Sequence, residues 1–112
     1  MKVKLIACGL AAATFSLYSA TASAEVMHLG VRSCGQWVKA RSAKGPAAMY
    51  YENWVAGYMS GLAAGTDKDF LNGMDEDSIM LWIDNYCQAN PLESVPGASL
   101  KLGFQLAKKK KL

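Results

Sequence analysis

The sequence predicts an all-α fold, a small single-domain bundle of about four helices closed by one disulfide. Apolar residues recur at three- and four-residue spacing in successive segments, which is the periodicity of helices with one buried face. Glycine and proline fall between these segments and mark turns. Beyond the N-terminal apolar segment there are two cysteines, Cys34 and Cys87, and such a pair in an exported chain is typical of one disulfide.

Residues 1–24 have the organisation of a secretory signal peptide. A basic start is followed by an apolar run over 5–17 and by the small residues Ala22-Ser23-Ala24, after which cleavage is predicted. The run is shorter than the ~18 to 20 apolar residues that a spanning helix needs. We therefore expect a periplasmic protein with no stable membrane insertion.

The remaining chain divides into an acidic body and a basic C-terminal tail. Residues 25–100 hold five basic groups against nine acidic ones, whereas four lysines stand together at 108–111. An acidic body argues against a nucleic-acid-binding face. The tail, residues 108–112, is interpreted as a solvated helix end where cations suit the helix dipole, with a weak anchor to anionic lipid or cell wall as the alternative.

The first two helices are predicted over residues 28–43 and 46–64, separated by Lys44-Gly45-Pro46. Glycine suits a helix end, and proline is tolerated in a first turn. In the second helix, aromatic residues recur every four positions (Tyr50, Trp54 and Tyr58), and so do glycines (Gly57, Gly61 and Gly65). A glycine in mid-helix costs about 0.5 to 1 kcal/mol, so we expect a compensating close approach by another helix.

The third helix is predicted over Glu76–Ala89, with Asp75 or Asp77 as its N-terminal cap. Its buried stripe is predicted to consist of Ile79, Trp82, Ile83, Tyr86 and Cys87. The opposite side of the helix is predicted to carry Met80, Asp84 and Gln88. The last helix is expected to begin near Ser94 or Val95 and to continue through Leu106 toward the lysines.

An acidic loop is predicted over residues 65–77. If Asp67 were the first position of a calcium loop, Asn72 would replace the required glycine and Ser78 the bidentate glutamate, so calcium binding is not expected. An apolar pair within an acidic loop is typical of a protein-binding tip. The candidate contact residues are Phe70 and Leu71 as anchors, with Asp67, Asp69 and Glu76 as a charged rim.

The sequence lacks a recognisable catalytic arrangement. Its single histidine, His28, stands close to the predicted mature N-terminus, and a nucleophile needs both a base and an orienting group within reach. Both mature cysteines are used by the predicted disulfide, and there is no phosphate loop, dinucleotide fingerprint or metal ligand set. We therefore expect a binding protein without cofactor or metal, not an enzyme.

Three segments together resemble one known pattern: Ser33-Cys34-Gly35-Gln36-Trp37, Trp54 to Gly61, and Trp82 to Leu92. They resemble the Rap/Tai family of periplasmic immunity proteins associated with type VI secretion. The resemblance implies that residues 25–107 form a helical immunity domain, often a homodimer, that binds a peptidoglycan amidase effector and blocks its active cleft. It also implies that Cys34 and Cys87 form the structural bridge and that Trp37, Trp54 and Trp82 belong to the core.

Two other functions remain open from the sequence. Periplasmic acid-stress chaperones are also small, helical, exported and closed by one disulfide, and they expose apolar surface when their carboxylates are protonated. A structural factor of the wall or envelope is the third possibility, suggested by the basic tail.

Overall fold

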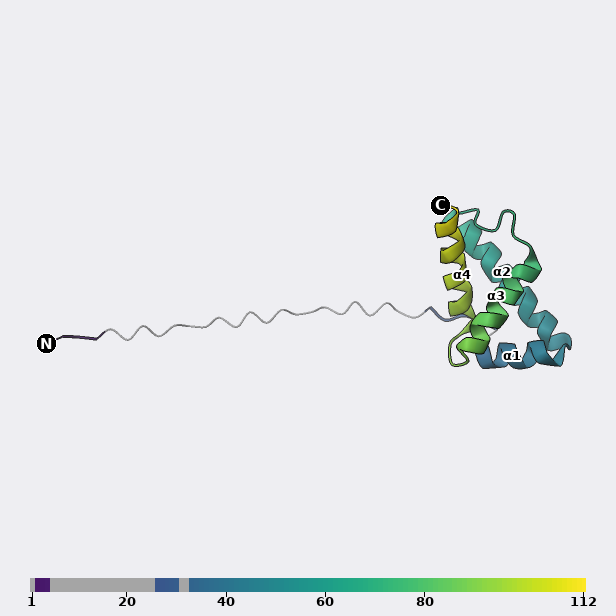
Figure 1. Ribbon diagram of the computed structural model, residues 1–112, viewed down its shortest axis with the longest axis horizontal. Helices are drawn as coiled ribbons and strands as arrows, with labels where there is room; N and C mark the ends of the chain where they lie inside the picture. The colour runs from purple at the N-terminus through teal and green to yellow at the C-terminus, as the bar shows by residue number, and fades with distance from the viewer. Residues whose placement is uncertain (1, 5–25, 31–32) are drawn as a thin grey trace.

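The computed structural model describes residues 2–4, 26–30 and 33–112 (Figure 1). Apart from residues 2–4, the predicted signal peptide lies outside the described residues. The described part of the chain contains four helices: α1 Cys34–Ala43, α2 Pro46–Thr66, α3 Glu76–Ala89 and α4 Val95–Lys109. Helix α1 lies across one end of the bundle, where it packs on α3, while α2 packs along α4 (Figure 1). The predicted all-α bundle is confirmed.

Each helix begins where a side chain can satisfy its free N–H groups or where a proline needs no partner. Ser33 caps α1: its Oγ accepts from the Gln36 N–H at 3.1 Å, and the Gln36 side chain accepts from the Ser33 N–H at 3.3 Å. Asp75 and Ser94 cap α3 and α4, and Pro46 stands in the first turn of α2. Because the cap is at Ser33, α1 begins later than the predicted start at residue 28.

The predicted disulfide joins α1 to α3. The Cys34 and Cys87 side chains are fully buried, and their Cα atoms are 4.7 Å apart. Beside the bridge, the Cys34 N–H donates to the Glu93 carbonyl at 2.9 Å, and Ser33 pairs with Ser94 in an isolated antiparallel bridge. The starts of α1 and α4 and the end of α3 are therefore held together at one corner of the bundle.

The core lies between the four helices. Its largest fully buried side chains are Trp37, Phe70, Met59, Ile83, Val55 and Val95. Trp37 is thus a core residue, whereas Trp54 and Trp82 are half-buried and pack against the edge of the core. Of the three tryptophans, only Trp37 matches the core role that the resemblance implies.

The expected helix contact at the glycines of α2 is wrong. Gly57, Gly61 and Gly65 are exposed, and no atom lies within 4 Å of the position that a Cβ would take at any of them. The buried side of α2 carries Val55 and Met59 instead. The close approach is made by Gly103 of α4, where a Cβ would lie 2.7 Å from the Leu62 Cδ2.

The predicted polar side of α3 also needs correction. Met80 is only 4% exposed, and Asp84 is half-buried and hydrogen-bonded to α1. Helix α3 packs against α1, α2 and α4, so it buries a wider stripe than one contact face would. Gln88, by contrast, is exposed as expected.

The C-terminal lysines continue the last helix and fold back on the loop between α2 and α3. Helix α4 extends to Lys109, and the Lys110 Nζ donates to the Asn72 carbonyl. From the loop, the Lys68 Nζ donates to the Leu112 carbonyl at 3.4 Å. The C-terminus therefore lies beside this loop, at the end of the bundle opposite α1 (Figure 1).

Candidate protein-binding surface

The loop between α2 and α3 is shaped by its own backbone. Asp67 takes a left-handed conformation with φ of 52° and ends α2, and Gly73 has φ of 77°. Within the loop, the Met74 N–H donates to the Leu71 carbonyl at 2.9 Å, and the Phe70 N–H donates to the Lys68 carbonyl at 2.8 Å. Together with the contacts from the C-terminus, these bonds hold the loop in a defined shape.

The structure separates the predicted contact residues into three groups. Phe70 is 1% exposed and packs under the loop near Gly103, so its expected role as an exposed anchor is wrong. An apolar side chain in this loop can fill the gap between α2 and α4, and burial there is more favourable than exposure. Leu71 is half-buried, whereas Asp67, Asp69 and Glu76 are exposed as expected.

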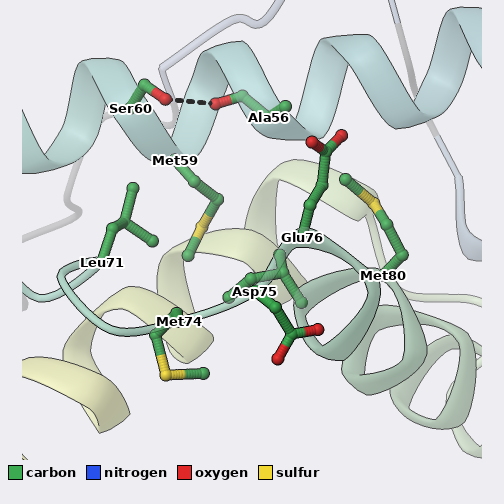
Figure 2. Close-up of a pocket in the computed structure, with 9 residues that line it drawn as sticks. Ala56, Met59, Ser60, Leu71, Met74, Asp75, Glu76 and Met80 are labelled. Atoms are coloured by element: carbon green, nitrogen blue, oxygen red, sulfur yellow. Dashed lines mark hydrogen bonds between the residues drawn. The ribbon is translucent and has the colours of Figure 1, made fainter.

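Leu71 and Glu76 both line a hollow between α2, the loop and the start of α3. The hollow has a volume of about 160 Å³. Figure 2 shows the Met59 side chain reaching from α2 toward the loop, with Leu71 and Met74 on the loop side and Met80 on α3. Its full lining is Ala56, Met59, Ser60, Leu71, Met74, Asp75, Glu76, Ile79 and Met80. Asp67 and Asp69 do not line it.

The polar side chains that line the hollow differ in whether they already have a hydrogen-bond or ion-pair partner. The Ser60 Oγ donates to the Ala56 carbonyl of its own helix at 2.7 Å. Asp75 accepts from the Ser78 N–H at 2.8 Å and from the Ser78 Oγ at 2.7 Å, and these bonds hold the pKa of Asp75 below its usual value. The described residues form two ion pairs, and Arg41 makes both of them, with Glu52 and Asp84. The Glu76 carboxylate therefore has no cationic partner among the described residues.

Three of the lining residues are methionines, and the sequence reasoning missed them as a group. Met59 and Met80 are almost fully buried, at 1% and 4% exposure, while Met74 is 37% exposed. Methionine side chains are flexible and polarizable, so such surfaces adapt to apolar groups of different shapes. The signal available in the sequence was Met74, an apolar residue within the acidic loop.

A second polar cluster joins three helices through Arg41. Its guanidinium donates to Asp84 of α3 through Nε at 2.9 Å and Nη2 at 2.7 Å, and it also pairs with Glu52 of α2. The hydrogen bond with Asp84 is the main reason that the pKa of Arg41 is raised further above its usual value. The Trp37 Nε1 donates to the same Asp84 carboxylate at 2.7 Å. A permanently charged guanidinium that bonds to two other helices fits a structural tie.

The described N-terminal segment, residues 26–30, lies on the aromatic residues of α2. The Trp54 Nε1 donates to the Leu29 carbonyl at 2.6 Å, and the His28 ring lies 5.4 Å from that of Tyr58. Burial raises the pKa of Tyr58. The aromatic ridge predicted in the second helix is therefore partly covered by this chain's own N-terminal segment.

Within the described residues, no group of three or more His, Cys, Asp or Glu side chains is placed to hold a metal ion. None of the helices in this part of the chain has the length and apolar character that crossing a membrane requires.

The chain was compared with models of known protein families, with curated proteins and with solved structures. None of the three comparisons finds a match.

Proposed function

We propose that this protein is exported to the periplasm, binds a protein partner and is not an enzyme. The observation that carries the proposal is the methionine-lined hollow, which is open at the surface and bordered by acidic residues. A binding surface gains affinity when it is already ordered before the partner arrives. Here the α1–α3 disulfide and the capped start of α3 supply that order.

We further propose that the partner is a peptidoglycan amidase effector of type VI secretion. The resemblance of residues 33–37, 54–61 and 82–92 to the Rap/Tai immunity proteins supports this partner class. An inhibitor of this kind binds beside or across the active cleft and excludes the substrate. The acidic loop and the hollow are the surface that we assign to this contact.

The test uses the processed, oxidised protein and a panel of purified exported peptidoglycan amidases. We expect one amidase to be retained on the immobilised protein and to lose its activity at a one-to-one ratio. A reduced and alkylated sample serves as the control for an intact fold. If an excess of the folded protein leaves every amidase fully active and unbound, the amidase proposal is contradicted.

A second candidate, an acid-stress chaperone, is favoured by one observation. Arg41 ties α1 to α2 and α3 through ion pairs with two carboxylates, those of Glu52 and Asp84, and ion pairs of carboxylates are a general source of acid sensitivity in folded proteins. A chaperone of this class binds ANS at low pH while it keeps its helical circular dichroism. ANS binding without helix loss would favour the chaperone, and its absence would favour the immunity protein.

A further inference from the structure

We propose that the hollow receives a single apolar side chain from a helix of the partner, and that a lysine or arginine beside that side chain pairs with Glu76. This inference rests on the proposed function, because it names the chemistry of the partner at the same surface. It follows from the size of the hollow, from its lining and from the charge at its edge.

The size of the hollow sets the size of the group that fits. Its volume is about 160 Å³, and an apolar cavity of about 150 Å³ in another protein accommodates benzene. One leucine-, methionine- or phenyl-sized group therefore fits. The walls are apolar at Met59, Ile79 and Met80, so the group that enters must be apolar as well.

The negative charge at the edge of the hollow favours a basic side chain on the partner, next to the apolar side chain that enters. Of the two acidic residues in the lining, Asp75 is engaged with Ser78 as the cap of α3. Glu76 is exposed, its side chain points toward α2 at the margin of the hollow (Figure 2), and no described cation pairs with it. A cation on the partner would complement this carboxylate.

The exposed face of α2 beside the hollow allows a helix to come close. At Gly57 and Gly61 nothing lies within 4 Å of a Cβ position, and Ser60 between them is exposed. Helices pack at interaxial distances of about 8 to 10 Å, and small residues permit the closest contacts. The bundle does not use these glycines for its own packing. A partner helix lying on this face can direct one side chain into the hollow.

The test uses an alanine-based helical peptide that carries one leucine with lysines three and four residues to either side. The peptide is titrated to millimolar concentration into the processed, oxidised protein, whose methionine methyl groups are isotopically labelled. We expect saturable shifts of the resonances of Met59, Met74 and Met80, and none at Met49, which lies on α2 outside the hollow. Unshifted hollow resonances would overturn the inference.

Peptide variants test the two parts of the recognition separately. Replacing the leucine by alanine is expected to weaken binding at least about tenfold, because the buried apolar group is lost. Replacing the lysines by glutamates is expected to weaken it by about two- to fivefold, the range for an exposed ion pair. Equal affinity of all three peptides would contradict the proposal.

Protein variants supply the matched controls. Ser60→Leu fills the mouth of the hollow and is expected to abolish the shifts, whereas Ala47→Leu adds the same side chain to an exposed position of α2 outside the hollow. Glu76→Gln is expected to remove the preference for lysine over glutamate peptides, and Glu93→Gln, at an exposed position outside the acidic loop and the hollow, to retain it. If Ser60→Leu binds as wild type does, the hollow is not the site.

The outcomes separate this inference from the proposed function. The peptide titration involves no amidase, so a panel of uninhibited amidases leaves its result intact. Conversely, an inhibited amidase with unshifted hollow resonances would place the interface elsewhere. If the same resonances shift with the protein's own concentration and the mass in solution doubles, the occupant is a second copy of this chain, which would overturn the assigned partner.

Discussion

The indole of Trp37 donates to the Asp84 carboxylate at 2.7 Å, across 47 positions of sequence. The same carboxylate accepts two hydrogen bonds from Arg41. One half-buried acidic group of α3 thus satisfies a fully buried tryptophan and a charged arginine of α1. Together with the disulfide, this contact fixes how α1 lies on α3.

The first prediction concerns this carboxylate. Asp84→Ala is expected to lower the free energy of unfolding by about 2 kcal/mol, because it removes charge-assisted hydrogen bonds and leaves the Trp37 N–H without its acceptor. Urea unfolding at neutral pH measures the change. The exposed neighbour Asn85 is the control, and Asn85→Ala should alter stability by no more than about 0.5 kcal/mol. Equal midpoints for the two variants would show that the Asp84 contacts contribute nothing.

The second prediction concerns the disulfide. The double variant Cys34→Ala and Cys87→Ala is expected to lose about 4 kcal/mol of stability, the loop-entropy value for a closed loop of this length. Because both side chains are 0% exposed, reductant should reach the bond only through unfolding. Thiol trapping under native conditions would therefore follow the unfolding rate. Rapid reduction of the folded protein would contradict the buried position.

The third prediction compares three glycines that lie within helices: Gly57 and Gly61 of α2, and Gly103 of α4. Gly57→Ala and Gly61→Ala should each raise stability by about 0.5 to 1 kcal/mol, since both positions are helical and open. Gly103→Ala should lower stability by about 1 kcal/mol, because the added Cβ would crowd Leu62 and Phe70. Thermal or urea melts of the three variants give the order. If Gly57→Ala instead lowered the stability, another helix would have to pack closely against Gly57, which would contradict the structure.

Part of the fold could be predicted from the sequence, and part of it could not. The helices were predictable because their apolar periodicity, the caps such as Ser33 and the break at Lys44-Gly45-Pro46 are all local features. The cysteine pair was predictable because Cys34 and Cys87 are the two cysteines that follow the predicted signal peptide, so each had one possible mate there. Glycine spacing was misleading because it gives no information about which side of α2 faces another helix.

The candidate site was only partly predictable, for a related reason. The acidic loop identified the region and two lining residues, Leu71 and Glu76. It could not show that Phe70 fills the core, because an apolar residue in a loop can point either way. Nor could it show the hollow itself, which forms only where α2, the loop and α3 meet.

The fourth prediction is a pH dependence at the start of α3. Hydrogen bonds from Ser78 lower the pKa of Asp75 in the folded protein, so Asp75 stabilises the fold above its ordinary pKa near 4. That contribution is lost as the pH falls through the lowered value. Asp75→Asn retains a capping side chain but does not titrate.

Unfolding curves between about pH 6 and pH 2 measure this contribution. The wild type should lose more stability over the range than Asp75→Asn does. Asp77→Asn, on the same exposed turn, is the control for a general effect of charge. Identical pH profiles of wild type and Asp75→Asn would mean that the cap makes no titratable contribution.

The proposed function and its assignment to the hollow are tested most directly by the inhibition of an exported peptidoglycan amidase by the processed protein, compared with its Ser60→Leu and Ala47→Leu variants. We predict stoichiometric inhibition by the wild type and by Ala47→Leu, and full amidase activity in the presence of Ser60→Leu. Inhibition by all three proteins, or by none of them, would contradict this prediction.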